Sequence, residues 1–422
     1  ASVIVTDLFD IKSDVLSFAK IRGGFGQTGN DAPAYLTSGY YSPASAGGGF
    51  GSLTFPLDGY LGLTRRSVVP STDLKPEIST EKEIGVDLRF FDSRVTLDFA
   101  FYDKSTSNQI ITASLAPESG YTSKVRNVGL ISNKGVELAM GFVPVRTKDF
   151  EWNILYTFTK NNNTVKELWD DVQEYNIYGL SNGPQLIAKV GEAMGTWIDY
   201  KIKTVTDESS PYYGMTIVNA NTGYPLYDTS ETEVLGKADY DFSMGLSNTI
   251  RWKDLTLGFS FDYRKGGLMY SATKGIVLFN GNAEETMYNM RDPFVWPNAV
   301  YQDDAGFHEN NVPVDQYYTM NGVWYSNYNY VRYRDDLIDK TYIKLREVSL
   351  TYDLPKSLIG KAKWIQSAQL SVVGRNLLMW TPKQGLIDPD MTNYGNDLES
   401  QYGEYYSSPT TRSFGGGIKL VF

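Results

Sequence analysis

The chain has 422 residues and a net charge of −10, and it is rich in Tyr (31 residues) and Gly (39 residues). The acidic balance argues against nucleic-acid binding, which depends on clustered Lys and Arg. The chain has no Cys and a single His, His308, so disulfides, thiolate metal sites and a His-dependent catalytic triad are not expected. No run of about 18 uncharged apolar residues predicts a transmembrane helix.

Alternating apolar and polar residues first form a clear pattern in residues 83–103. Ile84 to Phe90 and Val95 to Phe101 each place apolar side chains on one face, which is typical of β-strands with two unlike environments. The segment Phe91-Asp-Ser93 between them predicts a tight turn, so this region is expected to be a β-hairpin. The same alternation continues in residues 136–142, 152–158, 242–252 and 255–264.

The polar rows of these strands carry charged residues in mid-strand, which favours a wet interior over a dry core. We expect seven of them to face a lumen, where mutual pairing would be their first role and a part in a cargo pathway a secondary one. They are Asp87, Arg89, Asp98, Glu137, Arg251, Asp262 and Arg264.

The connections between strands are unequal in length. Those at residues 91–93 and 252–254 are very short, whereas 160–240 and 265–338 are long and polar. A soluble β protein also alternates, but short turns at one end and long loops at the other are the plan of outer-membrane barrels. The sequence therefore predicts an all-β protein of about a dozen strands, an antiparallel transmembrane β-barrel with short periplasmic turns and long extracellular loops.

Two strands near the end of the chain have special features. In residues 342–352 the apolar parity changes between Leu345 and Val348, which predicts a β-bulge near Arg346-Glu347. In the last segment Phe414, Ile418, Leu420 and Phe422 share one face, as in a strand between lipid and water. We expect this segment to be the closing strand of a barrel.

The long loops contain the candidate binding residues, because binding groups usually lie on loops held by a rigid scaffold. Aromatic faces stack on sugar rings while Asn, Asp and Arg bond hydroxyl groups. The alternative role is an aromatic girdle at the membrane surface or packing of the loops. The candidates for substrate contact are Trp197, Tyr200, Trp296, Trp324, Tyr325, Asn327, Tyr328 and Tyr330.

Loop carboxylates are the candidates for metal binding and for catalysis. Asp388 and Asp390, with Asp335, Asp336 and Asp339, offer the oxygen ligands that Ca²⁺ favours, but none has EF-hand spacing. Solvated loop carboxylates are therefore the preferred interpretation, and no metal site or cofactor is predicted. No catalytic motif is present, so we expect no enzymatic activity.

Five segments in order along the chain resemble the SusC/RagA family of TonB-dependent transporters. They are Lys20–Asn30, Asp73–Asp87, Tyr342–Pro355, Gly374–Leu378 with Gly385–Asp390, and Pro409–Phe422. The resemblance implies a Bacteroidetes-like outer-membrane barrel of about 22 strands that is filled by an amino-terminal plug. It also implies that this barrel imports an oligosaccharide or, less often, a peptide. It also implies a SusD-like lipoprotein lid, and Phe422 as the signal read by the outer-membrane insertion machinery.

The chain departs from this family pattern at its start. The plug, the segment that contacts TonB and the first strands have no counterpart, so residues 1–422 are interpreted as the carboxyl-terminal part of the barrel, about half of it. TonB–ExbB–ExbD would act through the missing plug region, and other strands would have to complete the wall, because open edges are not viable in lipid. The alternatives are a passive porin-like barrel, an adhesin, or a soluble glycan-binding or glycan-cleaving β protein.

Overall fold

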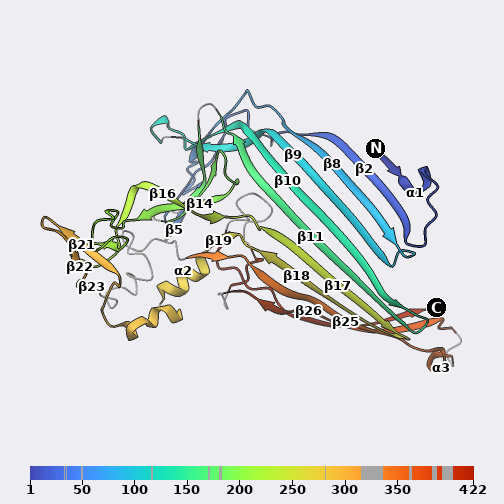
Figure 1. Cartoon of the computed structure of the whole chain (residues 1–422). Helices are drawn as coiled ribbons and strands as arrows, with labels where there is room; N and C mark the ends of the chain where they lie inside the picture. Colours follow the sequence, from blue (N-terminus) through green and yellow to red (C-terminus); the bar gives the residue numbers. More distant parts are fainter. Residues whose placement is uncertain are drawn as a thin grey trace.

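The structure is a computed structural model, and it describes residues 1–422 with gaps. The residues outside the description are 33, 35, 49–50, 116, 170–171, 180–182, 281, 315–335, 361–363, 383–386 and 392–402. Most of the remaining chain belongs to one large curved sheet and to a layer of smaller sheets at one end of it (Figure 1).

The large sheet has twelve strands, in agreement with the dozen predicted from the sequence, and along its main path each strand is antiparallel to its neighbours. We call it the wall. A short parallel strand, β7 (Val68–Val69), pairs with the beginning of one wall strand. The other wall strands, in spatial order, are β1 (Ser2–Ile4), β2 (Leu16–Asn30), β8 (Glu77–Phe90), β9 (Val95–Ser114), β10 (Ser123–Arg146), β11 (Phe150–Glu167), β17 (Phe242–Trp252), β18 (Leu255–Lys265), β25 (Tyr342–Asp353), β26 (Ser367–Trp380) and β28 (Ser413–Val421).

Short turns join the wall strands at one end, which we call the short-turn end. Phe91, Asp92 and Ser93 between β8 and β9 have φ values of 52°, 52° and 62°, and Lys253 between β17 and β18 has a φ of 54°. Such left-handed residues reverse the chain within two or three positions. The hairpin predicted over residues 83–103 is therefore confirmed.

The two faces of the wall differ in the way that the alternation predicts. One face exposes a continuous set of large apolar side chains, which a soluble sheet would bury against a core. A band of this kind suits contact with lipid. Its members include Ile84, Phe99, Phe101, Leu246, Leu350, Leu370, Val372, Ile418 and Leu420.

The opposite face is polar, and its glycines make room for long side chains that lean across from neighbouring strands. A Cβ on Gly85 would lie 2.7 Å from the Arg22 guanidinium carbon, and one on Gly135 would collide with the hydroxyl of Tyr102. Each glycine lies directly opposite the long side chain on the neighbouring strand: Gly85 pairs with Arg22, and Gly135 pairs with Tyr102. The large polar side chains can therefore lie flat along the wall.

Several wall strands are longer than a membrane requires. The strands β9, β10 and β11 contain 20, 24 and 18 residues, whereas about 9–11 tilted residues cross the hydrocarbon region. The described part of the wall is an open sheet: β28 pairs with β26, and β1 and β2 form the other edge.

The long connections at residues 160–240 and 265–338 fold, in their described parts, into small sheets of their own. We call this region the loop layer, and it gathers at the end of the wall opposite the short turns (Figure 1). One sheet combines β12 (Glu174–Gly179), β13 (Gln185–Lys189), β14 (Thr196–Ile202) and β16 (Tyr227–Lys237). Another combines β15 (Thr216–Val218), β21 (Ala299–Asp303) and β22 (Gly306–Glu309).

The remaining small sheets join segments that are far apart in the sequence. The strands β24 (Leu337–Asp339), β19 (Leu268–Ser271) and β27 (Gly403–Glu404) form one sheet. The three pairs are β20 (Phe294–Val295) with β23 (Pro313–Val314), β3 (Tyr41–Pro43) with β6 (Leu63–Arg65), and β4 (Ser45–Gly48) with β5 (Gly51–Thr54). The α-helices are α1 (Val5–Leu8), α2 (Ala272–Phe279) and α3 (Lys356–Ile359), and within the described ranges no helix has the length and apolar character to cross a membrane.

Candidate functional site

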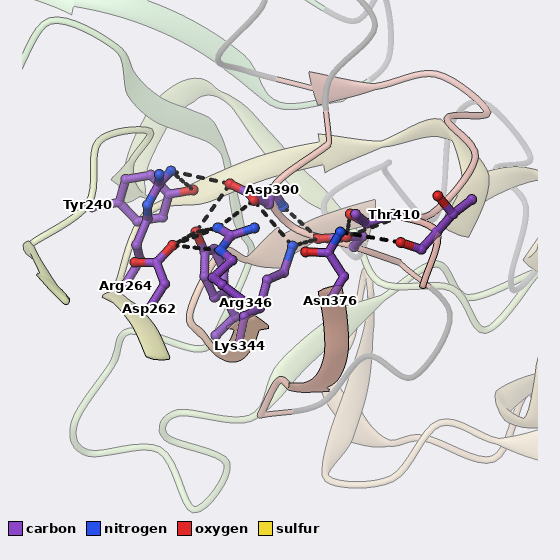
Figure 2. A network of polar contacts seen from close by, with 11 residues as sticks. Tyr240, Asp262, Arg264, Lys344, Arg346, Asn376, Asp390 and Thr410 are labelled. Carbon is purple, nitrogen blue, oxygen red and sulfur yellow. Dashed lines mark hydrogen bonds and ion pairs between the residues drawn. The ribbon is translucent and has the colours of Figure 1, made fainter. Parts of the chain in front are cut away.

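A network of charged and hydroxyl side chains lies where the wall meets the loop layer (Figure 2). It joins side chains of β18 and β25 to the loop residues Asp388 and Asp390 and to Thr410. We call it the junction network. Because it links the wall to the last long loop, it is the strongest candidate for a functional site in the described part of the chain.

Arg346 bridges the wall and the loop. Its guanidinium lies 2.6 Å from the Asp262 carboxylate on β18 and 2.7 Å from the Asp390 carboxylate in the loop. The strand registers shift at this position against both neighbours, between Leu345 and Glu347. The predicted β-bulge is therefore confirmed, and it supplies the extra residue, Arg346, whose side chain reaches both carboxylates.

Lys344, on the same strand as Arg346, is buried under the loop. Its ammonium donates to Asp388 at 2.6 Å and to Asp390 at 3.2 Å, and the side chains of Lys344 and Asp388 are only 3% and 2% exposed. Asp388 also accepts hydrogen bonds from the Thr410 hydroxyl and, at 3.0 Å, from the backbone N–H of Asp390. The interpretation of Asp388 and Asp390 as solvated loop carboxylates is therefore wrong.

The charges of the junction network balance. Three carboxylates, Asp262, Asp388 and Asp390, meet three cations, Arg264, Lys344 and Arg346. Burial alone would raise the pKa of Asp390, but Lys344 and Arg346 lower it to about 2, and Lys344 and Thr410 likewise outweigh burial and lower the pKa of Asp388. Asp388 and Asp390 are therefore ionised at neutral pH, and each depends on its cationic partners, since an unpaired buried charge is costly.

A second cation group adjoins the network on its β17 side. Lys340 donates to the Ala238 carbonyl at 2.8 Å, and its ammonium lies 4.4 Å from the centre of the Tyr240 ring. The guanidinium of Arg264 lies 5.0 Å from the same ring. Burial lowers the pKa of Lys340 to about 8, although the nearby Asp239 carboxylate opposes the shift. Burial thus moves the ionisation of Lys340 toward neutral pH.

A buried carboxylate also organises the loop layer. Glu404 is 1% exposed and accepts hydrogen bonds from the Ser271 hydroxyl, from the Thr273 hydroxyl at 2.7 Å and from the Thr273 backbone N–H at 3.0 Å. These donors surround the first turn of α2, where a negative charge is favourable. The contact fixes the last loop to a segment 133 residues earlier in the chain.

The seven charged residues predicted for the lumen are on one face of the wall. Cross-strand registers place Asp87 beside Asp98, Asp98 beside Ala139, and Asp262 beside Lys344, and directly opposed residues share a face. Most are ion-paired: Arg89 with Asp87, Asp98 with Arg22, Arg251 with Glu151, Asp262 with Arg346, and Arg264 with Asp390, whereas Glu137 is exposed. That this face lines a lumen and a cargo pathway stays a prediction.

The predicted aromatic contacts have different surroundings. Trp197 is fully buried and donates to the Leu268 carbonyl, so it braces the core of the loop layer. Trp296 is half-buried and packs in a small cluster with Tyr224 and Val314, and Tyr200 is half-buried on β14. The remaining candidates, Trp324, Tyr325, Asn327, Tyr328 and Tyr330, lie outside the described residues, and contact with cargo is untested for all eight.

Several residues of the junction network were not predicted as site residues. Lys344, Arg346, Tyr342 and Thr410 belong to it, and Tyr342 donates to Asp262 at 3.0 Å. The sequence signal for Arg346 was the parity change of its strand. Among the described residues, no three His, Asp or Glu side chains are placed to hold a metal ion, and the expectation that the chain binds no metal or cofactor remains untested.

Comparisons with known proteins agree with this architecture. The profile of the family described as "TonB dependent receptor-like, beta-barrel" matches residues 13–231, just over half of the chain. "TonB-dependent receptor P3" of Formosa agariphila is 27% identical over 374 residues, which cover 83% of this chain and 34% of that protein. "TonB-dependent receptor P26" of the same organism is 25% identical, with coverages of 96% and 40%.

Two further matches concern a receptor and a solved structure. "TonB-dependent receptor SusC" of Bacteroides thetaiotaomicron is 26% identical over 263 residues, which cover 58% of this chain and 25% of that protein. The structure of the RagAB peptide transporter has a TM-score of 0.71 and 19% identity, with 99% of this chain and 42% of that chain covered. The chain thus spans about two fifths or less of the length of these proteins. The predicted resemblance and the antiparallel barrel fold are confirmed.

Proposed function

The chain belongs to the family of TonB-dependent receptor-like β-barrels, and on that premise we propose that it is part of the wall of an outer-membrane importer. The observation that carries the proposal is the unlike pair of faces on one sheet. The outer face exposes large apolar side chains such as Phe101 and Val372, and the inner face pairs charges such as Arg22 with Asp98. A sheet of this kind separates lipid from water.

We propose a nutrient oligosaccharide as the cargo, with a peptide as the alternative. The support is chemical: the loops of the chain are rich in Tyr, Trp and Asn, which stack on sugar rings and bond hydroxyl groups. Trp324 to Tyr330 is the densest segment of this kind, and Tyr200 and Trp296 are secondary candidates. The same side chains also bind peptides, so direct binding has to decide between the two cargoes.

The proposed partners follow from the family. A SusD-like lipoprotein would cover the mouth as a lid, and TonB–ExbB–ExbD would supply energy through a plug region. The chain matches 34% to 40% of the length of its first two relatives, so we propose that further strands complete the barrel. We also propose that Phe422, which stacks on Trp364 at 5.3 Å between ring centres, is read by the outer-membrane insertion machinery.

Within this importer, we assign the junction network the role of holding the last loop against the inner face of the wall. Lys344 and Arg346 bind the loop carboxylates Asp388 and Asp390 with a balanced set of buried charges. These charged side chains are all paired in only one arrangement. Moving any one of them would leave a charge without its partner where little water can reach it. The loop would then present a fixed surface to the cargo.

The experiment that tests the proposed function is an uptake measurement. The full-length gene is deleted in the bacterium that encodes the chain, and depletion of a labelled oligosaccharide mixture and of a labelled peptide mixture is followed by mass spectrometry. We expect depletion of one mixture to stop in the deletion strain and to return when the full-length gene is restored. A complemented strain with an impaired TonB system should behave like the deletion strain.

The alternatives give different results in the same experiment. A passive porin-like barrel would allow uptake that persists without TonB. An adhesin or structural barrel would leave both mixtures unaffected by the deletion. Either result would contradict the importer proposal.

A further inference from the structure

A polar cavity lies at the long-loop end of the wall, away from the junction network. Its volume is about 360 Å³. It is lined by the segment before β8, by Asn108 on β9, by the first residues of β10 and by Trp169, which follows the end of β11. The residues that give it chemical character are Asp73, Lys75, Lys124, Arg126, Asn127 and Trp169. We call it the basic cavity.

The charge of the basic cavity opposes that of the whole chain. The chain has 49 acidic and 39 basic residues, yet this cavity is lined by three basic residues and one acidic residue, Asp73. A local positive excess in an acidic protein raises the local concentration of anions and excludes cations. The cavity is therefore suited to a ligand with at least one negative charge.

One lysine farther along β10 is neutralised by a neighbour, since Lys134 lies 2.8 Å from Asp103 on β9. Across the described ranges, by contrast, neither Lys75 nor Lys124 has an ion-pair partner. Two lysines without carboxylate partners thus line one cavity and are available to an incoming anion.

The frame of the basic cavity is fixed by hydrogen bonds rather than by the charged groups. The Asn127 side chain accepts from the Lys75 backbone N–H at 2.7 Å and donates to the backbone carbonyls of Lys75 and Asn108 at 2.6 Å and 2.8 Å. The buried hydroxyl of Ser71 donates to the Val125 carbonyl. The segment before β8 is thereby fastened to β10, and the cavity exists before any ligand arrives, which lowers the cost of binding.

Trp169 adds an aromatic wall to the cavity. Its ring meets the ring of Tyr175 edge to face, with 5.4 Å between the ring centres, so its orientation is held. A fixed indole beside cationic side chains matches an acidic sugar, whose ring can pack on the aromatic face while its anionic group meets the lysines. A neutral sugar would use only half of these contacts.

We propose that the basic cavity is a binding subsite for the anionic group, a carboxylate or a sulfate ester, of an acidic oligosaccharide. Lys75 and Lys124 hold the charge, Arg126 lines the same side, and Trp169 packs on the sugar ring. The proposal rests on the proposed import function and deepens it, since it specifies the chemical class of the cargo.

The test is calorimetric binding to the purified full-length transporter in detergent. The probes are tri-galacturonate, a monosulfated galactotriose, neutral galactotriose and the peptide trialanine. We expect at least one anionic saccharide to bind roughly tenfold or more tightly than neutral galactotriose, since a charge-assisted hydrogen bond contributes on that order. The preference should shrink as the salt concentration rises. The two anionic probes distinguish a carboxylate from a sulfate.

The variant for this test is Lys75→Gln with Lys124→Gln, and the matched control is Lys203→Gln, an exposed lysine in the loop layer. The double variant should lose the preference for the anionic saccharide, with neutral galactotriose binding unchanged, and the control should keep it. Equal binding of charged and neutral saccharides by the unaltered protein would overturn the proposal. So would an unchanged preference in the double variant, and so would trialanine binding as tightly as the anionic saccharides.

Failure of this proposal is distinguishable from failure of the proposed function. A transporter that depends on TonB for uptake of neutral oligosaccharides and ignores the anionic probes keeps the importer function and loses the anionic subsite. A barrel that binds the anionic probes but takes up nothing in a TonB-dependent way keeps the subsite and loses the importer function.

Discussion

The polar face of the wall contains two arginines that each bridge two carboxylates, one near either edge of the sheet. Arg22 lies 3.1 Å from Glu83 and 2.8 Å from Asp98, and Arg346 lies 2.6 Å from Asp262 and 2.7 Å from Asp390. The two arginine side chains are almost equally exposed, at 29% and 28%. The difference between the clusters therefore lies in their partners.

The cluster around Arg22 joins wall strands only, and its partner Asp98 is 51% exposed. The cluster around Arg346 continues into Lys344 and Asp388, which are nearly inaccessible beneath the last loop. The same ion-pair chemistry is thus a screened surface contact at one edge and a buried connection between wall and loop at the other. The comparison teaches that the covering loop, rather than the arginine, decides how much each pair contributes to stability.

The largest effect should follow from removal of the buried cation. The change Lys344→Met leaves Asp388 without its cation in a place with little solvent, which should cost about 3–5 kcal/mol. The last loop, including residues 387–391, should lose hydrogen-exchange protection in the full-length transporter. The matched control is Lys134→Met, whose ion pair with Asp103 is solvent-exposed. Unchanged protection in Lys344→Met would show that burial does not distinguish the two clusters.

The second prediction concerns a buried carboxylate that is held by hydroxyl and backbone donors. Replacing Glu404 by Gln removes the charge and turns one acceptor into a donor facing Ser271 or Thr273. A loss of about 1–3 kcal/mol is expected. Faster hydrogen exchange in α2 would report it, and Glu231→Gln, at an exposed pair with Lys201, is the control. Equal effects of the two changes would contradict the assigned role of Glu404.

The third prediction is a pH dependence of the buried region. The pKa of Lys340 is lowered from 10.5 to about 8 in the folded protein, so the unfolded chain binds more protons between these values. Stability should therefore rise as the pH increases from about 8 to 10.5, by up to about 3 kcal/mol, since each unit of pKa shift corresponds to about 1.4 kcal/mol. Urea unfolding of the full-length transporter at several pH values measures this rise. The variant Lys340→Met should flatten it, and an equally steep rise in that variant would assign it to another group.

The smallest effect should come from the exposed cluster. The change Arg22→Gln should lower the free energy of unfolding by less than about 1 kcal/mol, because solvent screens the pairs with Glu83 and Asp98. The effect should shrink further at high salt, as it does for exposed charges. Urea unfolding at low and high salt provides the measurement. A loss as large as that of Lys344→Met would remove the distinction between the two clusters.

Local sequence patterns predicted most of the long strands of the wall, although β26 and the short strands β1 and β7 were not identified. The hairpin at Phe91–Ser93 and the bulge at Arg346 both follow from side-chain parity, which the pleat of a strand reports directly. The loop layer was not predictable in this way. Its contacts join distant segments, such as the hydroxyl groups of Tyr178 and Tyr405, which are 227 residues apart.

The candidate site was predictable only in part, for a related reason. Asp262 and Arg264 were recognised because they stand in a polar row of a regular strand. Asp388 resembles a solvated loop residue until the fold brings Lys344, 44 residues away, to within 2.6 Å of it. Burial of a charge is a property of the tertiary structure, so local composition could not distinguish Asp388 from a solvated acid, or the enclosed Trp197 from a binding residue.

The length of β10 has a consequence for the position of the loop layer relative to the membrane. At roughly 3.3 Å per residue, its 24 residues exceed the tilted path through the hydrocarbon region about twofold. If the short turns lie near the inner surface of the membrane, the loop layer stands in the surrounding water, beyond the lipid headgroups. Under the proposed import function, solutes around the cell, through ionic strength and competing sugars, would then influence encounter with the cargo more than lipid composition does.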